Sequence, residues 1–208
     1  MQEKTYKIGI MGGTFDPIHI GHLILGETAY EQFALDKVLF MPSGNPPHKT
    51  HREGRAADEQ RTEMVALAIE DNPHFVLSLE EMNPDGYSYT YRTLERLNAE
   101  NPDTQFYFII GADSLCNFDN WMEPGRIAKA ANIVVATRNH MDNSELDAKI
   151  DELTQKYDGT FLKLDSLNID VSSEMLRDWI REERTVKYYI DDAVNDYIEA
   201  NDIYQHET

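Results

Sequence analysis

A pair of glycines followed by two histidines gives the clearest chemical signal in the chain. Gly12 and Gly13 end an apolar run, and their lack of side chains lets a backbone approach phosphate oxygens closely. His19 and His22 begin the next helical pattern, and because they are three residues apart they share one face of that helix. Both imidazoles can donate to phosphate oxygens, and a helix start directs N–H groups at an anion. The segment therefore predicts a phosphate cradle.

Two other interpretations of this segment find less support. It has neither the spacing of a Walker A loop nor that of G-x-G-x-x-G, so a hydride-transfer dinucleotide site is not supported. A zinc site is not supported either, because no Cys, His or acidic residue stands at metal-ligand spacing from the histidines. Asp16 is a candidate for a metal or supporting role, with turn chemistry before the helix as the alternative. We expect four residues to bind ATP phosphates here: Gly12, Gly13, Thr14 and Phe15.

A second anion-binding segment lies in the last fifth of the chain. Ser172 and Ser173 stand where a loop enters a helical pattern, so either hydroxyl could cap that helix. Arg177 follows Ser173 by four residues and shares its face. Alone, the segment would be interpreted as a serine cap and a surface arginine. Together with the first motif it predicts a polyphosphate clamp, because hydroxyls, free N–H groups and a guanidinium all suit phosphate oxygens.

The two segments resemble the signatures of one superfamily. The first is similar to the H-x-G-H motif of nucleotidyltransferases, and the second to their I-S-S-T-x-I-R motif. Glu174 stands where threonine is usual, and we assign it no phosphate contact. Class I aminoacyl-tRNA synthetases share the first motif, but they are larger than this chain and have a lysine-bearing second signature that it lacks.

A basic island in an otherwise acidic chain marks the expected substrate side. Residues 42–55 form a loop rich in Pro, Gly and His, and local positive charge there can gather anionic substrates. A solvated surface loop is the alternative for its outer arginines. The superfamily resemblance includes a P-P-H-K element at this place, which implies that His48 and Lys49 belong to the site. Three arginines complete the island: Arg52, Arg55 and Arg61.

Two further strings indicate which nucleotide is the acceptor. Asp113 could accept hydrogen bonds from ribose hydroxyls, and Trp121 could stack on an aromatic base, with a helix-start aspartate and a core tryptophan as the alternatives. Residues 111–127 and the S-Y-T-Y-R-T-L string at 88–94 resemble the nicotinate-mononucleotide adenylyltransferase family. That resemblance implies a pyridine nucleotide bound by His48, Thr90, the backbone of Tyr91, Asp113, Trp121, the backbone of Met122, and Arg138. After Arg138, Asn139-His140 replaces the Pro-Gly that is usual in the family.

The composition argues against several classes of protein. With 38 acidic against 19 basic residues, a net charge of −19 repels nucleic acid and anionic membranes. We expect neither as a partner, and no run approaches the length of a membrane span or a signal sequence. The single cysteine, Cys116, permits no internal disulfide, which fits a cytoplasmic protein, and we expect it to be a small packing residue.

The elements that must position these residues alternate between apolar runs and helical patterns, which is typical of a βαβ protein. We expect strands at residues 6–11, 37–41, 75–79, 106–110, 133–136 and 161–164. Helices are expected at 20–33, 57–69, around 94–97, 146–157, 173–181 and 188–200, and 83–86 is expected to form a turn. The chain is thus predicted to be an α/β protein with a doubly wound, Rossmann-like parallel sheet and C-terminal helices. We expect one domain over 1–208, with 165–208 packed on it as a C-terminal helical portion.

The resemblance implies adenylyl transfer from ATP to nicotinate mononucleotide without a protein nucleophile. Mg²⁺ would arrive with ATP and use few protein ligands. Phosphopantetheine adenylyltransferase, a cytidylyltransferase and a non-catalytic nucleotide sensor remain the alternatives, and a homo-oligomer is compatible with the sequence. The choice between the acid and amide forms of the pyridine is left open. Catalytic roles are implied for His19, His22, Lys49 and Arg177.

Overall fold

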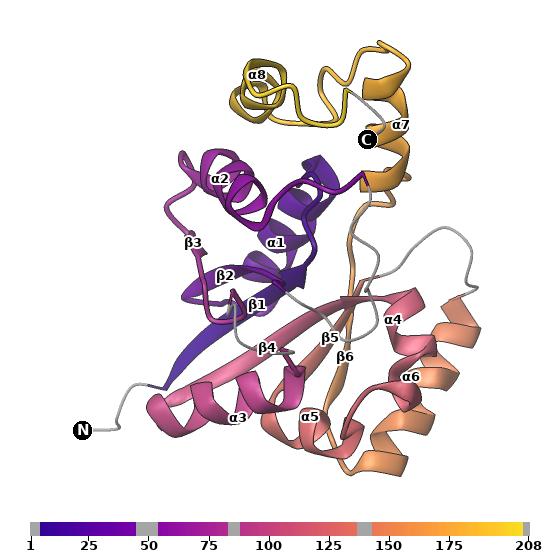
Figure 1. Cartoon of the computed structure of the whole chain (residues 1–208). Coiled ribbons are helices and arrows are strands. Elements are labelled where there is room, and N and C mark those ends of the chain that lie inside the picture. The colour runs from indigo at the N-terminus through magenta and orange to yellow at the C-terminus, as the bar shows by residue number, and fades with distance from the viewer. Residues whose placement is uncertain (1–4, 45–53, 83–87, 137–142, 206–208) are drawn as a thin grey trace.

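A parallel sheet forms the centre of the computed structural model, which describes residues 5–44, 54–82, 88–136 and 143–205. Within these ranges the sheet has six strands in the order β3-β2-β1-β4-β5-β6, and each neighbouring pair is parallel (Figure 1). This is the strand order of a doubly wound fold, as the alternation of elements predicted. The strands are β1 (Tyr6–Gly13), β2 (Lys37–Pro42), β3 (Phe75–Leu77), β4 (Thr104–Gly111), β5 (Asn132–Ala136) and β6 (Phe161–Leu164).

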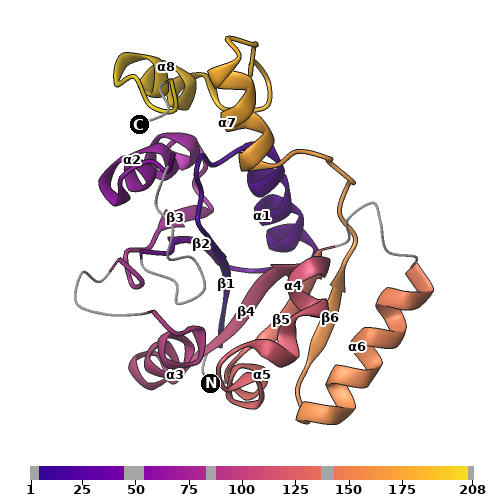
Figure 2. The same ribbon diagram turned by 45° about the vertical axis from the view of Figure 1, so that its right-hand side comes forward.

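Helices cover both faces of the sheet. One face carries α1 (Ile20–Gln32) and α2 (Asp58–Ile69), and the other carries α3 (Thr90–Glu100), α5 (Pro124–Ala130) and α6 (Asn143–Tyr157) (Figure 2). Two short helices, α4 (Ala112–Cys116) and the 3₁₀ helix η1 (Phe118–Asn120), follow β4. Because both faces are covered, the middle of each central strand is mostly apolar. In β4, Tyr107 and Ile109 belong to the core under α1, whereas Phe108 and Ile110 belong to the opposite core.

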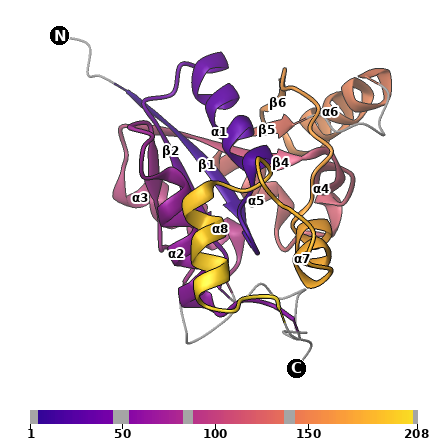
Figure 3. The same ribbon diagram turned by 90° about the horizontal axis from the view of Figure 1, so that it is seen from above.

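The C-terminal helices extend the core on the α1 face. α8 (Asp192–Ala200) lies over α2, whereas α7 (Ser173–Arg181) begins beside Pro17, just before α1 (Figure 3). Val194 and Ile198 of α8 are buried in the same hydrophobic cluster as Met64 and Val65 of α2. α8 therefore shields apolar side chains of α2 that would otherwise meet water.

The fold places two glycine-ended strands side by side at its centre. β1 and β4 are neighbours, and the chain leaves their carboxyl ends toward opposite faces, with α1 after β1 and α4 after β4. Such a topological switch point leaves a crevice at the carboxyl edge, which is where doubly wound proteins bind ligands. Gly13 ends β1 and Gly111 ends β4.

Most expected elements are confirmed, with two corrections. The last helix begins at Asp192 and not at Tyr188, because the Asp191 carboxylate caps it by accepting from the Ala193 N–H at 2.9 Å. Tyr188 has φ 70° and is 83% exposed, a backbone conformation outside any helix. β3 ends at Leu77, since the chain turns at Leu79, whose carbonyl accepts from the Met82 N–H.

Cys116 also differs from expectation. It is exposed at the end of α4 and is not a packing residue. The expected turn at 83–86 lies outside the described residues. Among the helices that are described, none is both long and apolar enough to cross a membrane.

Candidate active site

The two motif histidines meet at the start of α1, beside the end of β1. His19 is the N-cap residue and is 3% exposed, whereas His22 is half-buried. Their rings stack with centroids 3.8 Å apart and planes at 25°. The edge of Phe15 packs against His22 with ring centroids 5.0 Å apart. The spacing of three residues thus brings both imidazoles together, as predicted.

A backbone hydrogen bond sets the tautomer of His22. Its Nδ1 accepts from the backbone N–H of His19 at 3.3 Å. In the neutral ring the hydrogen therefore lies on Nε2, because one imidazole nitrogen donates while the other accepts. Nε2 is then the atom of His22 that can donate to a phosphate oxygen.

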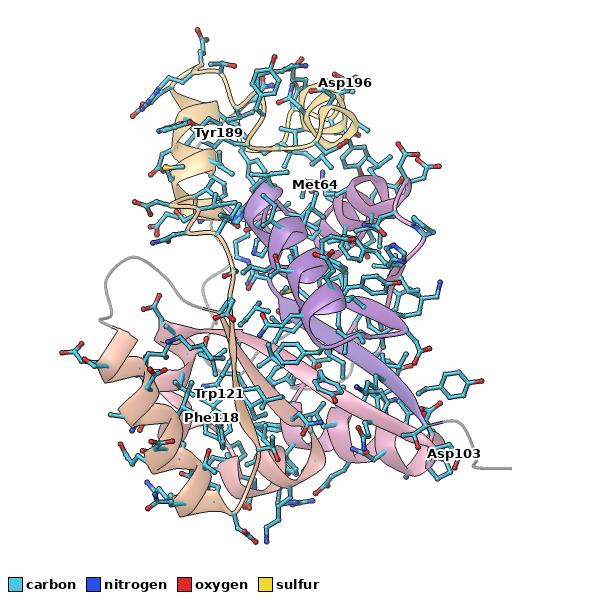
Figure 4. The ribbon with its side chains drawn as sticks, turned by 180° about the vertical axis from the view of Figure 1, so that it is seen from behind. Met64, Asp103, Phe118, Trp121, Tyr189 and Asp196 are labelled. Carbon is cyan, nitrogen blue, oxygen red and sulfur yellow. The ribbon has the colours of Figure 1, made fainter. Side chains whose placement is uncertain are left out.

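The start of α1 is less open to an anion than expected. Its first N–H, that of Ile20, donates to the carbonyl of Tyr189 at 2.8 Å. Tyr189 lies beside α7 in the connection between the C-terminal helices (Figure 4). Anion binding at this helix start must therefore rest on the histidines and the glycine loop, without the Ile20 N–H.

The C-terminal motif is held directly against the first one. Ser172 caps α7, with its Oγ accepting from the Met175 N–H at 3.1 Å. Ser173 Oγ donates to the carbonyl of Pro17 at 2.8 Å, and Arg177 Nη1 donates to the carbonyl of Asp16 at 2.6 Å. Two segments that are 161 residues apart in the chain therefore form one structure at the start of α1.

Asp16 is the buried centre of this junction, with an exposed fraction of 2%. Its Oδ1 accepts from the Ala56 N–H at 3.0 Å and from the Tyr204 hydroxyl at 2.7 Å. Its Oδ2 lies 3.6 Å from Arg55 Nε and 3.8 Å from Arg177 Nη1. Burial, with the Asp16 charge close by, raises the pKa of Tyr204 far above its usual range, so the hydroxyl keeps its proton. A carboxylate so engaged by protein donors does not fit the metal-ligand role considered for Asp16.

Arg61 corrects the expectation of a basic substrate surface. It is fully buried and donates from Nη1 to the carbonyl of Thr14 at 2.5 Å. Its Nη2 donates to the carbonyl of Ser43 at 2.8 Å and to Asp58 at 2.6 Å. Arg61 thus joins the loops after β1 and β2 and is not free to bind a substrate. The other expected members His48, Lys49 and Arg52 lie outside the described residues, as does Arg138.

Gly12 and Gly13 at the end of β1 are needed for close packing, whereas Gly111 at the end of β4 is not. A Cβ on Gly13 would lie 3.0 Å from the Phe15 ring, and one on Gly12 would lie 3.3 Å from Phe108. Apart from its chain neighbours, a Cβ on Gly111 would meet no atom of the described residues within 4 Å. Open space therefore adjoins the end of β4, at the switch point where a ligand is expected.

The expected acceptor residues begin α3. Tyr89 is the N-cap, and its carbonyl accepts from the N–H groups of Arg92 and Thr93. The N–H groups of Thr90 and Tyr91 are thus in the first turn, where they have no carbonyl of the same helix to bond. Helix starts with such donors suit a carboxylate or phosphate.

Trp121 and its neighbours form an aromatic group after η1. The indole is half-buried, 5.7 Å from the ring of Phe118 and 6.1 Å from that of Phe108 by centroid (Figure 4). Met122 and Asp113 are exposed. Trp121 is therefore neither a fully buried core residue nor an isolated surface ring.

Two sets of polar contacts hold this acceptor region, and neither is visible as a motif in the residue pattern. Asp119 of η1 accepts from the Tyr157 hydroxyl at 2.5 Å and from Lys156 Nζ at 2.9 Å, and these bonds lower the pKa of its carboxyl. Arg126 of α5 donates to both carboxylate oxygens of Glu95 on α3, at 2.7 and 2.5 Å. The segment with Trp121 is thereby tied to α6 and to α3, which begins with Thr90.

Comparisons with known proteins agree with this arrangement. A family model described as cytidylyltransferase-like matches residues 10–179. A probable nicotinate-nucleotide adenylyltransferase from Lachnoclostridium phytofermentans is 43% identical over 95% of this chain and 98% of its own. One from Clostridium perfringens (strain 13 / Type A) is 41% identical over 97% and 99%. The chain belongs to the nicotinate-nucleotide adenylyltransferase family.

Solved structures show the same fold at lower identity. Nicotinic acid mononucleotide adenylyltransferase from Plasmodium falciparum, complexed with NaAD, gives a TM-score of 0.75 at 20% identity, over 96% of this chain and 97% of that one. The doubly wound sheet and its C-terminal helices are thus a fold that nicotinate-nucleotide adenylyltransferases have elsewhere.

Proposed function

We propose that this protein transfers the adenylyl group of ATP to nicotinate mononucleotide, giving nicotinate adenine dinucleotide and pyrophosphate for NAD biosynthesis. The main observation is that Arg177 and Ser173 meet the H-x-G-H loop at the switch point, where a polyphosphate would lie. The relatives from Lachnoclostridium phytofermentans and Clostridium perfringens are named for this activity, and the chain matches them over nearly their whole length. Because ATP is the donor, the protein is expected to work in the cytoplasm.

The proposed reaction needs positioned charge and no protein nucleophile. A phosphate oxygen of nicotinate mononucleotide forms a bond to the α-phosphorus of ATP. The bond from that phosphorus to the bridging oxygen breaks, and pyrophosphate leaves with the electron pair. Catalysis then consists of alignment and stabilisation of negative charge. The groups proposed to supply positive charge and donors are His19, His22, Lys49 and Arg177, with the backbone of Gly12, Gly13, Thr14 and Phe15 and the hydroxyls of Ser172 and Ser173. Ser173 would donate to phosphate after its hydroxyl turns away from the Pro17 carbonyl, to which it donates in this structure.

Mg²⁺ is proposed to enter on the phosphates of ATP. The hard cation prefers oxygen ligands, keeps several waters and commonly binds substrate phosphates in place of a protein cage. The described residues contain no group of three or more His, Cys, Asp or Glu side chains placed to hold a metal ion. Bound to ATP, the ion would neutralise phosphate charge beside the histidines.

The acceptor is proposed to bind between α3 and the segment with Trp121. The first-turn N–H groups at Thr90 and Tyr91 would donate to the pyridine carboxylate, and the Trp121 indole would stack on its ring. Donors at this place favour the acid over the amide, whose NH₂ group cannot accept. Asp113, the backbone of Met122, His48 and Arg138 are proposed to complete the acceptor site.

Pyrophosphate release with ATP and Mg²⁺ tests this function. Nicotinate mononucleotide, nicotinamide mononucleotide and phosphopantetheine are compared in parallel, and CTP replaces ATP in a matched reaction. We expect release with ATP and the nicotinate form, at a kcat/KM at least about tenfold above that of the amide. Preference for the amide would overturn the carboxylate site alone. Activity only with phosphopantetheine or CTP would assign another transferase reaction, and ATP binding without release would indicate a sensor.

A further inference from the structure

The end of the chain contacts the phosphate-binding loop through one buried hydroxyl. Tyr204 is 8% exposed, and its hydroxyl donates to Asp16 Oδ1 at 2.7 Å across 188 residues of sequence. Its backbone has φ 68°, in the left-handed region that bulky residues rarely adopt. A costly conformation that delivers a hydroxyl to a buried carboxylate indicates a definite role for that bond.

Asp16 contacts both Tyr204 and Arg177 and so links the two residues. The carboxylate is 2% exposed, and its other oxygen lies 3.8 Å from Arg177 Nη1, while the Asp16 carbonyl accepts from the same nitrogen at 2.6 Å. Arg55 Nε lies 3.6 Å from this oxygen, so two guanidinium groups share one carboxylate. The rotation of the Asp16 side chain therefore sets how close its carboxylate lies to both positive groups.

The Tyr204 hydroxyl fixes that rotation. With the Ala56 N–H it gives Oδ1 two donors, which leaves Oδ2 on the side of the arginines. Without the hydroxyl, Oδ1 keeps one donor and the carboxylate can turn toward Arg177 or Arg55 more closely. A guanidinium that forms a closer ion pair with Asp16 has fewer N–H groups left to bind a polyphosphate.

We infer that Tyr204 is a positioning residue for the ATP side of the site: through Asp16 it holds Arg177 in place for the triphosphate. We expect Tyr204 to affect the binding of ATP and not that of the acceptor. The hydrophobic cluster that contains Tyr204 lies on the α1 face of the sheet, whereas Thr90 begins α3 on the opposite face. This inference rests on the proposed function, since it assigns Arg177 to ATP.

The test compares Tyr204→Phe with the wild-type protein in two measurements. Calorimetric titration with α,β-methylene-ATP and Mg²⁺, and separately with nicotinate mononucleotide, gives the affinity for each substrate. Initial rates give kcat and the two KM values. We expect Tyr204→Phe to weaken analogue binding and to lower kcat/KM for ATP about tenfold, with the affinity for nicotinate mononucleotide unchanged. Tyr197→Phe, a matched loss of a hydroxyl on α8, is expected to change neither.

A double-mutant cycle with Asp16→Asn separates positioning from general destabilisation. If the hydroxyl acts through Asp16, Tyr204→Phe has little further effect on analogue affinity in the Asp16→Asn background. Equal losses for both substrates, no loss for ATP, or additive losses in the double variant would overturn the inference. If the wild-type protein released no pyrophosphate but bound the analogue, the proposed reaction would fail while the binding cycle still tested Tyr204.

Discussion

His22 is the residue whose chemistry the structure defines most closely. Its Nδ1 accepts from the His19 backbone, so in the neutral ring Nε2 carries the hydrogen, and the stacked His19 ring and the Phe15 edge restrict its rotation. A donor held in place before the reaction stabilises developing charge without reorganising. The proposed role is therefore in the transition state more than in substrate binding.

Substituting His22 tests that role. We expect His22→Ala to lower kcat by about 100-fold or more, with KM for ATP changed by less than about threefold, because a transition-state donor mainly affects turnover. Steady-state pyrophosphate release gives both constants. His74→Ala removes a histidine that stacks on Tyr30 at 3.9 Å and is the matched control, expected to leave kcat unchanged. Equal losses in kcat and affinity, or normal turnover, would contradict the role.

Gly111 offers a second test at a single position. A Cβ here would meet no atom of the part of the chain that the structure describes within 4 Å, apart from its chain neighbours, and the residue is the N-cap of α4 with φ −80°. Threonine is about as good an N-cap as glycine, so Gly111→Thr should keep the melting temperature. We expect it to weaken substrate binding at least about tenfold because its side chain occupies the open space at the switch point. Gly125→Ala on α5 is the control, and unchanged affinity in Gly111→Thr would place the ligand elsewhere.

At the scale of elements, Glu81 joins the connection after β3 to two other segments. Its carbonyl accepts from the Gly44 N–H at 3.2 Å and from Ser88 Oγ at 2.9 Å. Burial raises the pKa of its carboxyl above the ordinary 4.5, while the Thr93 hydroxyl and the charge of Arg96 oppose that shift. The folded protein therefore binds this proton more tightly than the unfolded chain does.

The sign of this shift gives a pH prediction. The contribution of Glu81 to stability is fully present below its unfolded pKa and is lost as the pH rises through its higher folded value. Glu81→Gln is neutral at every pH and can still accept from Thr93. We expect the variant and the wild type to melt together near pH 4, and the variant to melt at a higher temperature at pH 7. Glu100→Gln, exposed at the end of α3, serves as the control, and a lower melting temperature at pH 7 would refute the sign.

The sequence predicted regular elements well and their short connections poorly. β4 and β5 are continuous apolar runs because both of their faces are buried, so their patterns were unambiguous. α4, η1 and α5 are too short for a helical period to be visible. The start of α8 depended on one capping aspartate, which an apolar pattern beginning near Tyr188 concealed.

For the site, local motifs were predictable from the sequence and long-range contacts were not. His19, His22 and Arg177 stand in local motifs, and the structure brings them together as expected. Tyr204 and the Tyr189 carbonyl contribute through long-range contacts. A backbone carbonyl leaves no mark in the residue types, and a tyrosine 188 residues from its partner has no spacing to recognise. Arg61 was misassigned because a buried guanidinium that binds carbonyls looks identical, in sequence, to a surface one.

At the scale of the whole molecule, α8 completes the core over α2. Ile198 is 1% exposed and belongs to the cluster that contains Met64 (Figure 4). We expect Ile198→Ala to lower the free energy of unfolding by about 2–5 kcal/mol, because it leaves a cavity in a packed core. Urea denaturation followed by circular dichroism measures this. Asp196→Ala on the exposed face of α8 should stay within about 0.5 kcal/mol of wild type, and an equally small effect of Ile198→Ala would show that α8 packs loosely.

The contacts of Tyr189 and Tyr204 also bear on how the protein is made. The H-x-G-H loop is synthesised first, and the groups that hold it follow 156 to 188 residues later. These groups are Ser173, Arg177, Tyr189 and Tyr204. A growing chain can therefore build most of its sheet while its phosphate loop lacks these partners. A chain that stopped before Tyr204 would leave Asp16 without that donor. The first motif of this protein therefore reaches its folded form only after residues that follow it by more than 150 positions have been made.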